Sequence, residues 1–134
     1  MSPPAWPLQV AIRGVLIADL DLMSLITGVY DHVPPAAVHP YVVVGDCVDR
    51  PDDAHDRRGW DSMATLHIWS RYRGTGQALQ ILGHLDRLLH RRPLVVPGYT
   101  DISIAHDWHQ TMRDPDPEVR HVPVRYRVWL AEEP

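Results

Sequence analysis

The segment His106-Asp107-Trp108-His109 has the residue types and spacing that come nearest to a metal or acid–base site. Imidazole and carboxylate groups are ordinary metal ligands and ordinary proton carriers in enzymes. In a continuous strand, however, His106 and His109 point to opposite faces, because side chains alternate. They converge only if the strand ends at His106. We therefore favour a solvated strand end, and a small metal-dependent enzyme using His106, Asp107 and His109 is the minor alternative.

Three other patterns give weaker signals for chemistry. The aspartate-rich segment 49–61 lacks the glycine and the terminal glutamate of an EF-hand, and Arg57 and Arg58 offset its charge. Cys47 lies in an apolar run with no histidine nearby in sequence, which favours a small hydrophobe over a nucleophile. Gly74-Thr75-Gly76 lacks the lysine and the third glycine of phosphate-binding loops. The residues therefore predict no catalytic group, no metal and no cofactor.

Composition indicates a globular chain of modest charge. It has 134 residues, of which 45% are apolar, a net charge of −4 and one cysteine. This length suits one domain, so we expect residues 1–134 to form a single unit. The small negative charge argues against a dedicated duplex-DNA binder, which carries a concentrated basic face. We see no signal peptide and no apolar run near the roughly 20 residues of a membrane span, so we expect no membrane partner.

The stretch from Ser62 to His90 is predicted to form the centre of the fold. Residues alternate from Ser62 to Ser70, which predicts a strand with Ala64, Leu66 and Ile68 on its apolar face. A glycine turn follows, with Thr75 as a helix cap. From Gln77 the period becomes 3.6, and one stripe collects Ala78, Ile81, Leu82, Leu85, Leu88 and Leu89. Because such a helix does not offset its own ordering entropy, it must pack on the sheet.

The remaining elements are predicted from the same two periods. Helical spacing covers 8–18 and 20–26, after a proline-rich segment 1–7 that we expect to be a loose arm. Strands are predicted at 40–48, which is apolar enough to be central or covered on both faces, at 100–108 and at 120–130. In the last strand Pro123 favours an edge position or the strand's start. Segment 49–61 is a protruding hairpin loop. The order predicts an α+β two-layer domain, with an antiparallel sheet of about four strands and two helices packed on one face.

Aromatic and arginine side chains gather on the sheet face turned away from these helices and in the hairpin loop beside it. Tryptophan with arginine is typical of contact surfaces, although a single tryptophan on a wet sheet face is ordinary. We therefore predict a subunit or partner interface. Its candidate residues are Asp52, Asp53, Arg57, Arg58, Trp60, Met63, Trp69, Arg125, Arg127 and Trp129.

Short motifs, taken in order, give the chain a family resemblance. Val29-Tyr30-Asp31-His32-Val33-Pro34 precedes His39-Pro40-Tyr41-Val42-Val43-Val44-Gly45; later come Leu66-His67-Ile68-Trp69-Ser70, an amphipathic helix from Gly76, and an arginine-rich last strand entered by Arg120-His121. This series resembles the tail terminator, or tail completion, family of long-tailed bacteriophages and gene transfer agents. The resemblance covers nearly the whole chain, and it depends on the order and spacing of the motifs.

The resemblance implies a structural role in a virion. Members of this family form a hexameric ring that caps the tail tube, stops tube polymerisation and joins the tail to head-completion proteins. DNA passes through the ring without sequence-specific binding, and no catalytic residues carry over. The expected location is the head-proximal end of the tail, after assembly in the bacterial host cytoplasm. The acidic loop 49–61 argues against a grip on DNA. Another head–tail connector or a tail tube subunit is the main alternative, and the small metal-dependent enzyme is the less favoured one.

Overall fold

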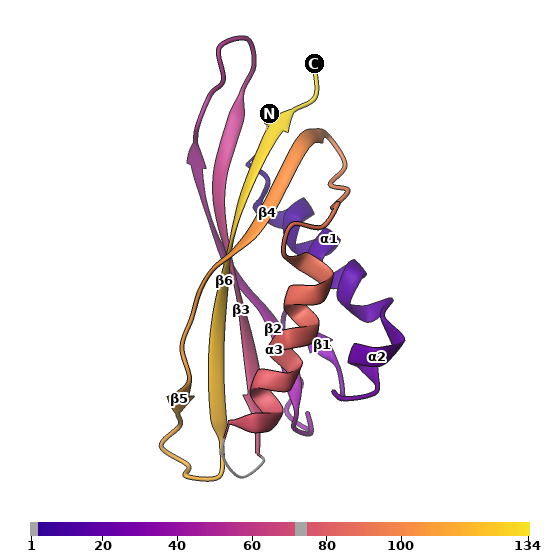
Figure 1. Cartoon of the computed structure of the whole chain (residues 1–134), viewed down its shortest axis with the longest axis vertical. Helices are drawn as coiled ribbons and strands as arrows, with labels where there is room; N and C mark the ends of the chain where they lie inside the picture. Colours follow the sequence, from indigo (N-terminus) through magenta and orange to yellow (C-terminus); the bar gives the residue numbers. More distant parts are fainter. Residues whose placement is uncertain (1–2, 72–74) are drawn as a thin grey trace.

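The computed structural model describes residues 3–71 and 75–134, and within them three helices lie beside one six-stranded sheet (Figure 1). The helices are α1 (Ala5–Ile17), α2 (Leu20–Met23) and α3 (Gly76–Leu89). The strands are β1 (Val29–Tyr30), β2 (Tyr41–Pro51), β3 (Gly59–Ser70), β4 (Tyr99–His109), β5 (Met112–Arg113) and β6 (Arg120–Glu132).

The strand order is β1-β2-β3-β6-β4, and β5 pairs with the start of β6. All pairings are antiparallel except the parallel pair of β1 with β2. The prediction of about four strands is therefore wrong. The sequence predicts a short extended segment at 30–35, next to the observed β1, but no strand at β5; both strands are only two residues long, which is too short for an alternating pattern to be visible.

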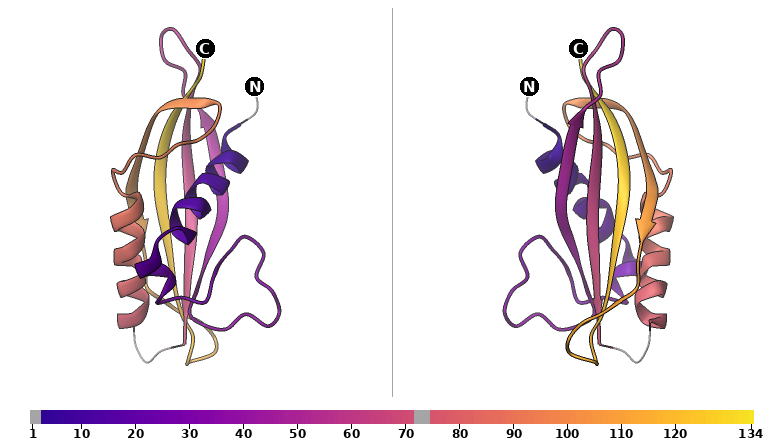
Figure 2. Two further views of the ribbon diagram at one scale, coloured as in Figure 1. Left: turned by 90° about the vertical axis from the view of Figure 1, so that its right-hand side faces the viewer. Right: turned by 90° about the vertical axis from the view of Figure 1, so that its left-hand side faces the viewer.

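The helices lie on one side of the sheet, as the edge-on arrangement in Figure 1 and the two side views in Figure 2 show. Helices α1 and α2 are joined to α3 by a charge contact. Asp19 caps α2 by accepting a hydrogen bond from the Leu22 backbone N–H (2.9 Å), and Arg87 of α3 binds the same carboxylate at 2.6 Å. Among the described residues, none of the helices has both the length and the apolar character needed to span a bilayer.

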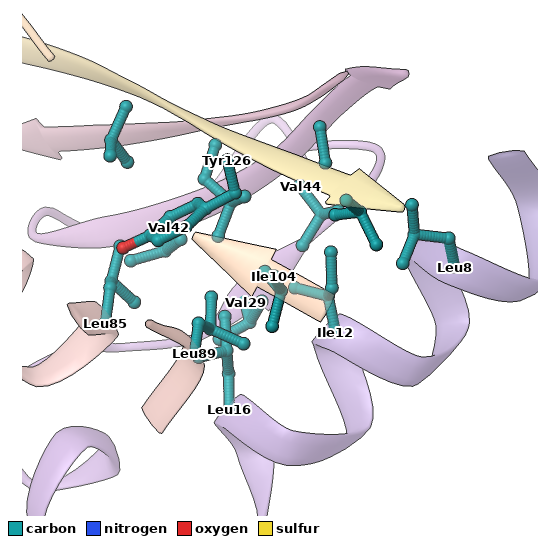
Figure 3. Close-up of a cluster of buried hydrophobic side chains, with 14 of the residues drawn as sticks. Leu8, Ile12, Leu16, Val29, Val42, Val44, Leu85, Leu89, Ile104 and Tyr126 are labelled. Atoms are coloured by element: carbon teal, nitrogen blue, oxygen red, sulfur yellow. The ribbon is translucent and has the colours of Figure 1, made fainter. Parts of the chain in front are cut away.

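The hydrophobic core fills the space between the helices and the sheet (Figure 3). The predicted apolar faces are confirmed in the two central strands: β3 buries Ala64, Leu66 and Ile68 completely, and the even-numbered residues of β6 from Val122 to Leu130 are also inaccessible. The predicted stripe of α3 is buried at Ala78, Ile81, Leu82, Leu85 and Leu89, whereas Leu88 is only partly buried. Helix α1 contributes Leu8, Ile12 and Leu16.

The helix termini differ from the sequence expectation. Helix α1 begins at Ala5, with Pro4 at its N-cap position, so it includes residues expected in the loose arm 1–7. Proline fits this first turn because the first N–H groups of a helix have no partner within it. Thr75 does precede α3, but its side chain makes no capping hydrogen bond. The rest of the predicted glycine turn, residues 72–74, lies outside the described part of the chain.

Strand β2 is not central, against the prediction, because it lies between the two-residue β1 and β3 near one edge. It buries Val42 and Val44 on the helix side only, and Val48 is 58% exposed. Its β-branched run therefore reflects strand propensity and not burial on both faces. The loop between β2 and β3 is residues 52–58, shorter than the expected 49–61 because both strands continue into it, and it projects from the end of the sheet (Figure 1).

Pro123 lies in β6, an interior strand, so the edge position is wrong, whereas the alternative, the strand's start, is close, because Pro123 is the fourth residue of β6. Its place along the strand explains why a residue without an N–H is tolerated. Pairing of β6 with β4 ends at Val124, opposite His109, and pairing with β5 begins at His121, opposite Met112. Pro123 stands in the gap between these two ladders.

Candidate assembly surface and the polar clusters around it

The sheet surface turned away from the helices, called the outer face below, combines side chains of β3 and β6. The register pairs Trp69 with His121, Met63 with Arg127 and Asp61 with Trp129. Paired residues in antiparallel strands project to the same side, so these side chains form one continuous surface. Most of them are half-buried. Five of the ten predicted interface residues therefore come together here: Met63, Trp69, Arg125, Arg127 and Trp129.

Two arginines of the outer face, Arg125 and Arg127, are held in ion pairs. Arg127 binds Asp61 through two bonds, Nε to Oδ1 at 3.0 Å and Nη2 to Oδ2 at 2.7 Å. Arg125 Nε donates to Asp107 Oδ2 at 2.9 Å. The hydrogen bond from Arg127 lowers the pKa of the Asp61 carboxyl. Exposed ion pairs of this kind add little to the stability of the fold. They do fix the orientation of the two guanidinium groups, and each arginine–aspartate pair has no net charge.

Trp129 connects the outer face to the hairpin loop. Its Nε1 donates to Asp52 Oδ2 at 3.0 Å, and the Gly59 backbone N–H donates to Asp53 Oδ1 at 3.2 Å. A Cβ at Gly59 would lie 2.7 Å from Trp129 Cζ2 and 2.3 Å from the Asp52 carbonyl oxygen, so only glycine leaves room there. The two loop aspartates thus hold the loop against the sheet.

The other loop candidates are arranged differently. Arg57 forms an ion pair with Asp101, at the start of β4. Arg58 lies over the ring of Trp60, 4.8 Å from its centroid. Trp60 itself is only 5% exposed and belongs to the core, so the structure places it on the helix side of the sheet and not on the outer face. The alternation of β3 already predicts this, because Trp60 has the same parity as Ala64.

Asp49 and Cys47, for which the sequence contains only weak signals of chemistry, also have structural partners. Asp49 accepts from the Ala5 backbone N–H at the start of α1 (3.2 Å) and from Ser62 Oγ (2.7 Å). Cys47 is half-buried against the core, and burial raises the pKa of its thiol to about 11. The thiol is therefore protonated near neutral pH and a poor nucleophile.

Two histidines on the outer face were missed by sequence reasoning. His67 Nδ1 and His121 Nε2 are 2.7 Å apart, and the Trp69 ring stacks on His121 with centroids 3.9 Å apart and planes inclined by 4°. A Cβ at Gly45 would lie 2.9 Å from the His67 ring, so glycine makes room for that imidazole. The cross-strand register is the signal that brings them together, and it is visible only once β3 and β6 are aligned.

Acidification is expected to destabilise the fold through this histidine pair. Burial lowers the pKa of His67 and of His121 from 6.5, and for His121 the His67 charge adds to this. As the pH falls below about 6.5, these histidines take up protons in the unfolded chain before they do so in the folded one, so the free energy of unfolding decreases. Above that pH both histidines are neutral in both states, and their contribution does not change with pH.

Urea unfolding at about pH 7.5 and about pH 5.5 measures this effect. The difference between the two pH values should shrink in a His67→Gln/His121→Gln variant, although some remains because burial also lowers the pKa of His39. An unchanged difference would show that the pair is not acid-sensitive.

The segment around His106 forms a second polar cluster, and here the expectation of divergent histidines is wrong. His106 Nε2 lies 2.9 Å from His109 Nδ1, while His106 Nδ1 lies 2.9 Å from both oxygens of Asp86 on α3. A register irregularity between His106 and Trp108 turns the strand and brings the imidazoles together. Asp107 does not join them, because its carboxylate binds Arg125.

This second cluster ties α3 to the sheet. The buried Tyr126 hydroxyl donates to Asp86 Oδ1 at 2.6 Å, and Figure 3 shows that hydroxyl reaching toward α3 beside Leu85. Burial, with the Asp86 carboxylate, raises the pKa of Tyr126 well above its usual value, so the phenol stays a donor. The backbone N–H of His106 also donates to His90 Nδ1 at 2.9 Å. In the described part of the chain, no three histidine, cysteine or acidic side chains are grouped to hold a metal.

This chain is similar to known proteins, to a family in its sequence and to a solved structure in its fold. No curated protein sequence matches the chain. A chain in the solved structure described as "Virion of native gene transfer agent (GTA) particle" is similar with a TM-score of 0.83 and 22% identity, covering 92% of this chain and 94% of that one. At this identity the likeness shows a shared fold.

The family model described as "Tail completion protein gp17" matches residues 10–131, from within α1 to the penultimate residue of β6. The matched region includes both central strands, all of α3 and the hairpin loop. The resemblance predicted from the motifs is confirmed by this match. The chain therefore belongs to the tail completion protein gp17 family.

Proposed function

We propose that this chain is a tail terminator, a structural virion protein that closes into a ring on the head-proximal end of the tail tube. The ring, a homohexamer by our proposal, stops polymerisation of the tube protein and offers its other side to a head-completion or connector protein. The single observation that carries the proposal is the tail completion family match over residues 10–131. The role is one of shape and contact, with no reaction assigned.

The outer face supports a contact role. A closed ring needs heterologous contacts, in which one surface of a protomer meets a different surface of the next. Tryptophan, histidine and paired arginines on a flat sheet supply the mixed aromatic and polar area that such contacts use. We assign Met63, Trp69, Arg125, Arg127 and Trp129 to this interface, together with Asp52, Asp53, Arg57 and Arg58 of the hairpin loop.

Charge pairing on this surface also bears on how DNA would pass the ring. Arg57, Arg125 and Arg127 each bind an aspartate of the same chain. Guanidinium groups that are already paired gain little from phosphates, and each phosphate contact would add affinity and slow passage. We propose that DNA slides through without sequence-specific binding.

Particle imaging tests the proposal. Sedimentation of the purified chain should reveal a closed oligomer, alone or on addition of tail tubes, and immunogold labelling of particles should mark one point, where tail meets head. Label along the whole tail would instead identify a tube subunit, and label on the head side of the joint a connector. A strictly monomeric protein absent from particles would contradict a virion role altogether.

A further inference from the structure

The His106–His109 pair has the arrangement of an incomplete metal site, distinct from the proposed interface. Two imidazole nitrogens, His106 Nε2 and His109 Nδ1, lie 2.9 Å apart and share one proton in a hydrogen bond, a place that a metal ion could take. Nitrogens bound to one metal at about 2.0–2.1 Å and about 90° apart are themselves about 2.9 Å apart, whereas tetrahedral angles place them farther, at about 3.3 Å. An ion that replaces the shared proton and keeps this separation would therefore be square-planar or octahedral and not tetrahedral zinc.

Asp86 gives the pair its chemical orientation. Its two oxygens lie 2.9 Å from His106 Nδ1, so that nitrogen carries the proton and Nε2 presents its lone pair toward His109. Metal-binding histidines commonly donate their other N–H to a carboxylate in this way. The carboxylate is held in turn by the Tyr126 hydroxyl at 2.6 Å. The tautomer and ring position of the first ligand are thus set before any metal arrives.

The second imidazole is accessible. His106 is largely covered, whereas His109 is exposed at the end of β4, so an ion can reach its Nδ1 once that nitrogen has a free lone pair. This requires the His109 proton to reside on Nε2, and the tautomer change leaves the imidazole neutral. The Asp86 charge nearby favours a cation. Water or another ligand would fill the remaining coordination positions, because no third protein ligand is grouped here among the described residues.

We propose that His106 and His109 bind a divalent transition metal ion of the nickel or copper type as a two-histidine chelate, with Asp86 as the positioning residue. Imidazole suits both ions, and both accept ligands at about 90°. The His67–His121 pair lacks the oriented carboxylate, because among the described residues no carboxylate accepts a hydrogen bond from either ring. The His67–His121 pair therefore serves as a control, a histidine pair without a carboxylate in the role of Asp86.

Isothermal titration of Ni²⁺ into untagged protein tests the site. We expect one ion bound per chain, and weakening by about tenfold or more in His109→Ala, since loss of even an outer-shell partner costs about 10–100-fold. Asp86→Asn keeps both imidazoles and should also weaken binding. His121→Ala, which removes one member of the comparison pair, should leave the affinity unchanged.

Loss of Ni²⁺ binding in His109→Ala would not be due to misfolding, because the His109 side chain is exposed and its removal should leave the fold intact. Circular dichroism of the variant checks this. Equal Ni²⁺ affinity of wild type and His109→Ala would overturn the proposal. So would a loss of binding in His121→Ala with none in His109→Ala, since the ion would then occupy the outer-face pair. Weakening in His109→Ala without weakening in a folded Asp86→Asn would keep the chelate but remove Asp86 from it.

Discussion

Replacing Leu85 by alanine is expected to lower the free energy of unfolding by about 2–5 kcal/mol, the range seen when a fully buried leucine leaves a cavity. Leu85 is 0% exposed and lies on the buried stripe of α3, facing the sheet where Tyr126 and Val42 line the core (Figure 3). Tyr126 cannot move to fill the space freely, because its hydroxyl is bound to Asp86, the next residue of the same helix. Partial collapse is therefore restricted, which favours the upper part of the range.

Leu79→Ala is the matched control for this prediction. Leu79 belongs to the same helix, so the change in helix propensity is the same, but its side chain is 39% exposed. Its loss should cost well under half as much as the Leu85 change. Urea or thermal unfolding of the two variants beside wild type measures the difference. Equal destabilisation, or near-wild-type stability of Leu85→Ala, would show that this stripe does not face the sheet as described.

The parts of the fold that sequence predicted well are those where periodicity and burial agree over a whole element. In β3 and β6, alternation placed Leu66 and Val124 on the core side, and the structure buries both completely. In α3 the 3.6 period gave the stripe that contains Leu85. Each of these elements is at least 12 residues long, so several helical turns or strand repeats indicate the same buried face.

The missed features depend on contacts between elements, which a one-dimensional pattern does not contain. The convergence of His106 and His109 comes from an irregular register between β4 and β6. The His67–His121 contact needs the alignment of β3 with β6. Pro123 is tolerated in an interior strand because two neighbouring ladders leave a gap beside it. All three are properties of pairing, and pairing is decided by turns and tertiary packing.

For the candidate interface, sequence found the residue types but not their internal partners. It predicted Asp52 and Asp53 as contact residues of an acidic loop and assigned them no partner within the chain, whereas Asp52 accepts from the Trp129 indole and Asp53 from the Gly59 backbone. It also grouped Trp60 with the surface, although β3 parity puts that ring in the core. A tryptophan is therefore informative about contact surfaces only after its face of the sheet is known.

Replacing Trp129 by alanine is expected to leave the fold stable while weakening ring assembly by about 2 kcal/mol or more per contact, a typical value for a tryptophan at the centre of an interface. The residue is half-buried on the outer face and its neighbours in β6, Val128 and Leu130, carry the core burial. Its loss removes aromatic area from the proposed contact and frees the hairpin loop, because Asp52 loses its donor. Sedimentation velocity over a concentration series measures the shift toward monomer, and unfolding curves measure the stability of the monomer.

Two further variants separate the causes. Trp129→Phe keeps most of the aromatic area but cannot donate a hydrogen bond to Asp52. Weakened assembly of this variant would therefore assign the effect to the anchored hairpin loop. Near-normal assembly would assign it to the aromatic side chain of residue 129. Trp6→Ala removes an equally large side chain that is 64% exposed on α1, on the helix side of the sheet. If Trp6→Ala disrupts the oligomer and Trp129→Ala does not, the protomers meet through the helix layer, and the outer face must be free to contact another virion protein.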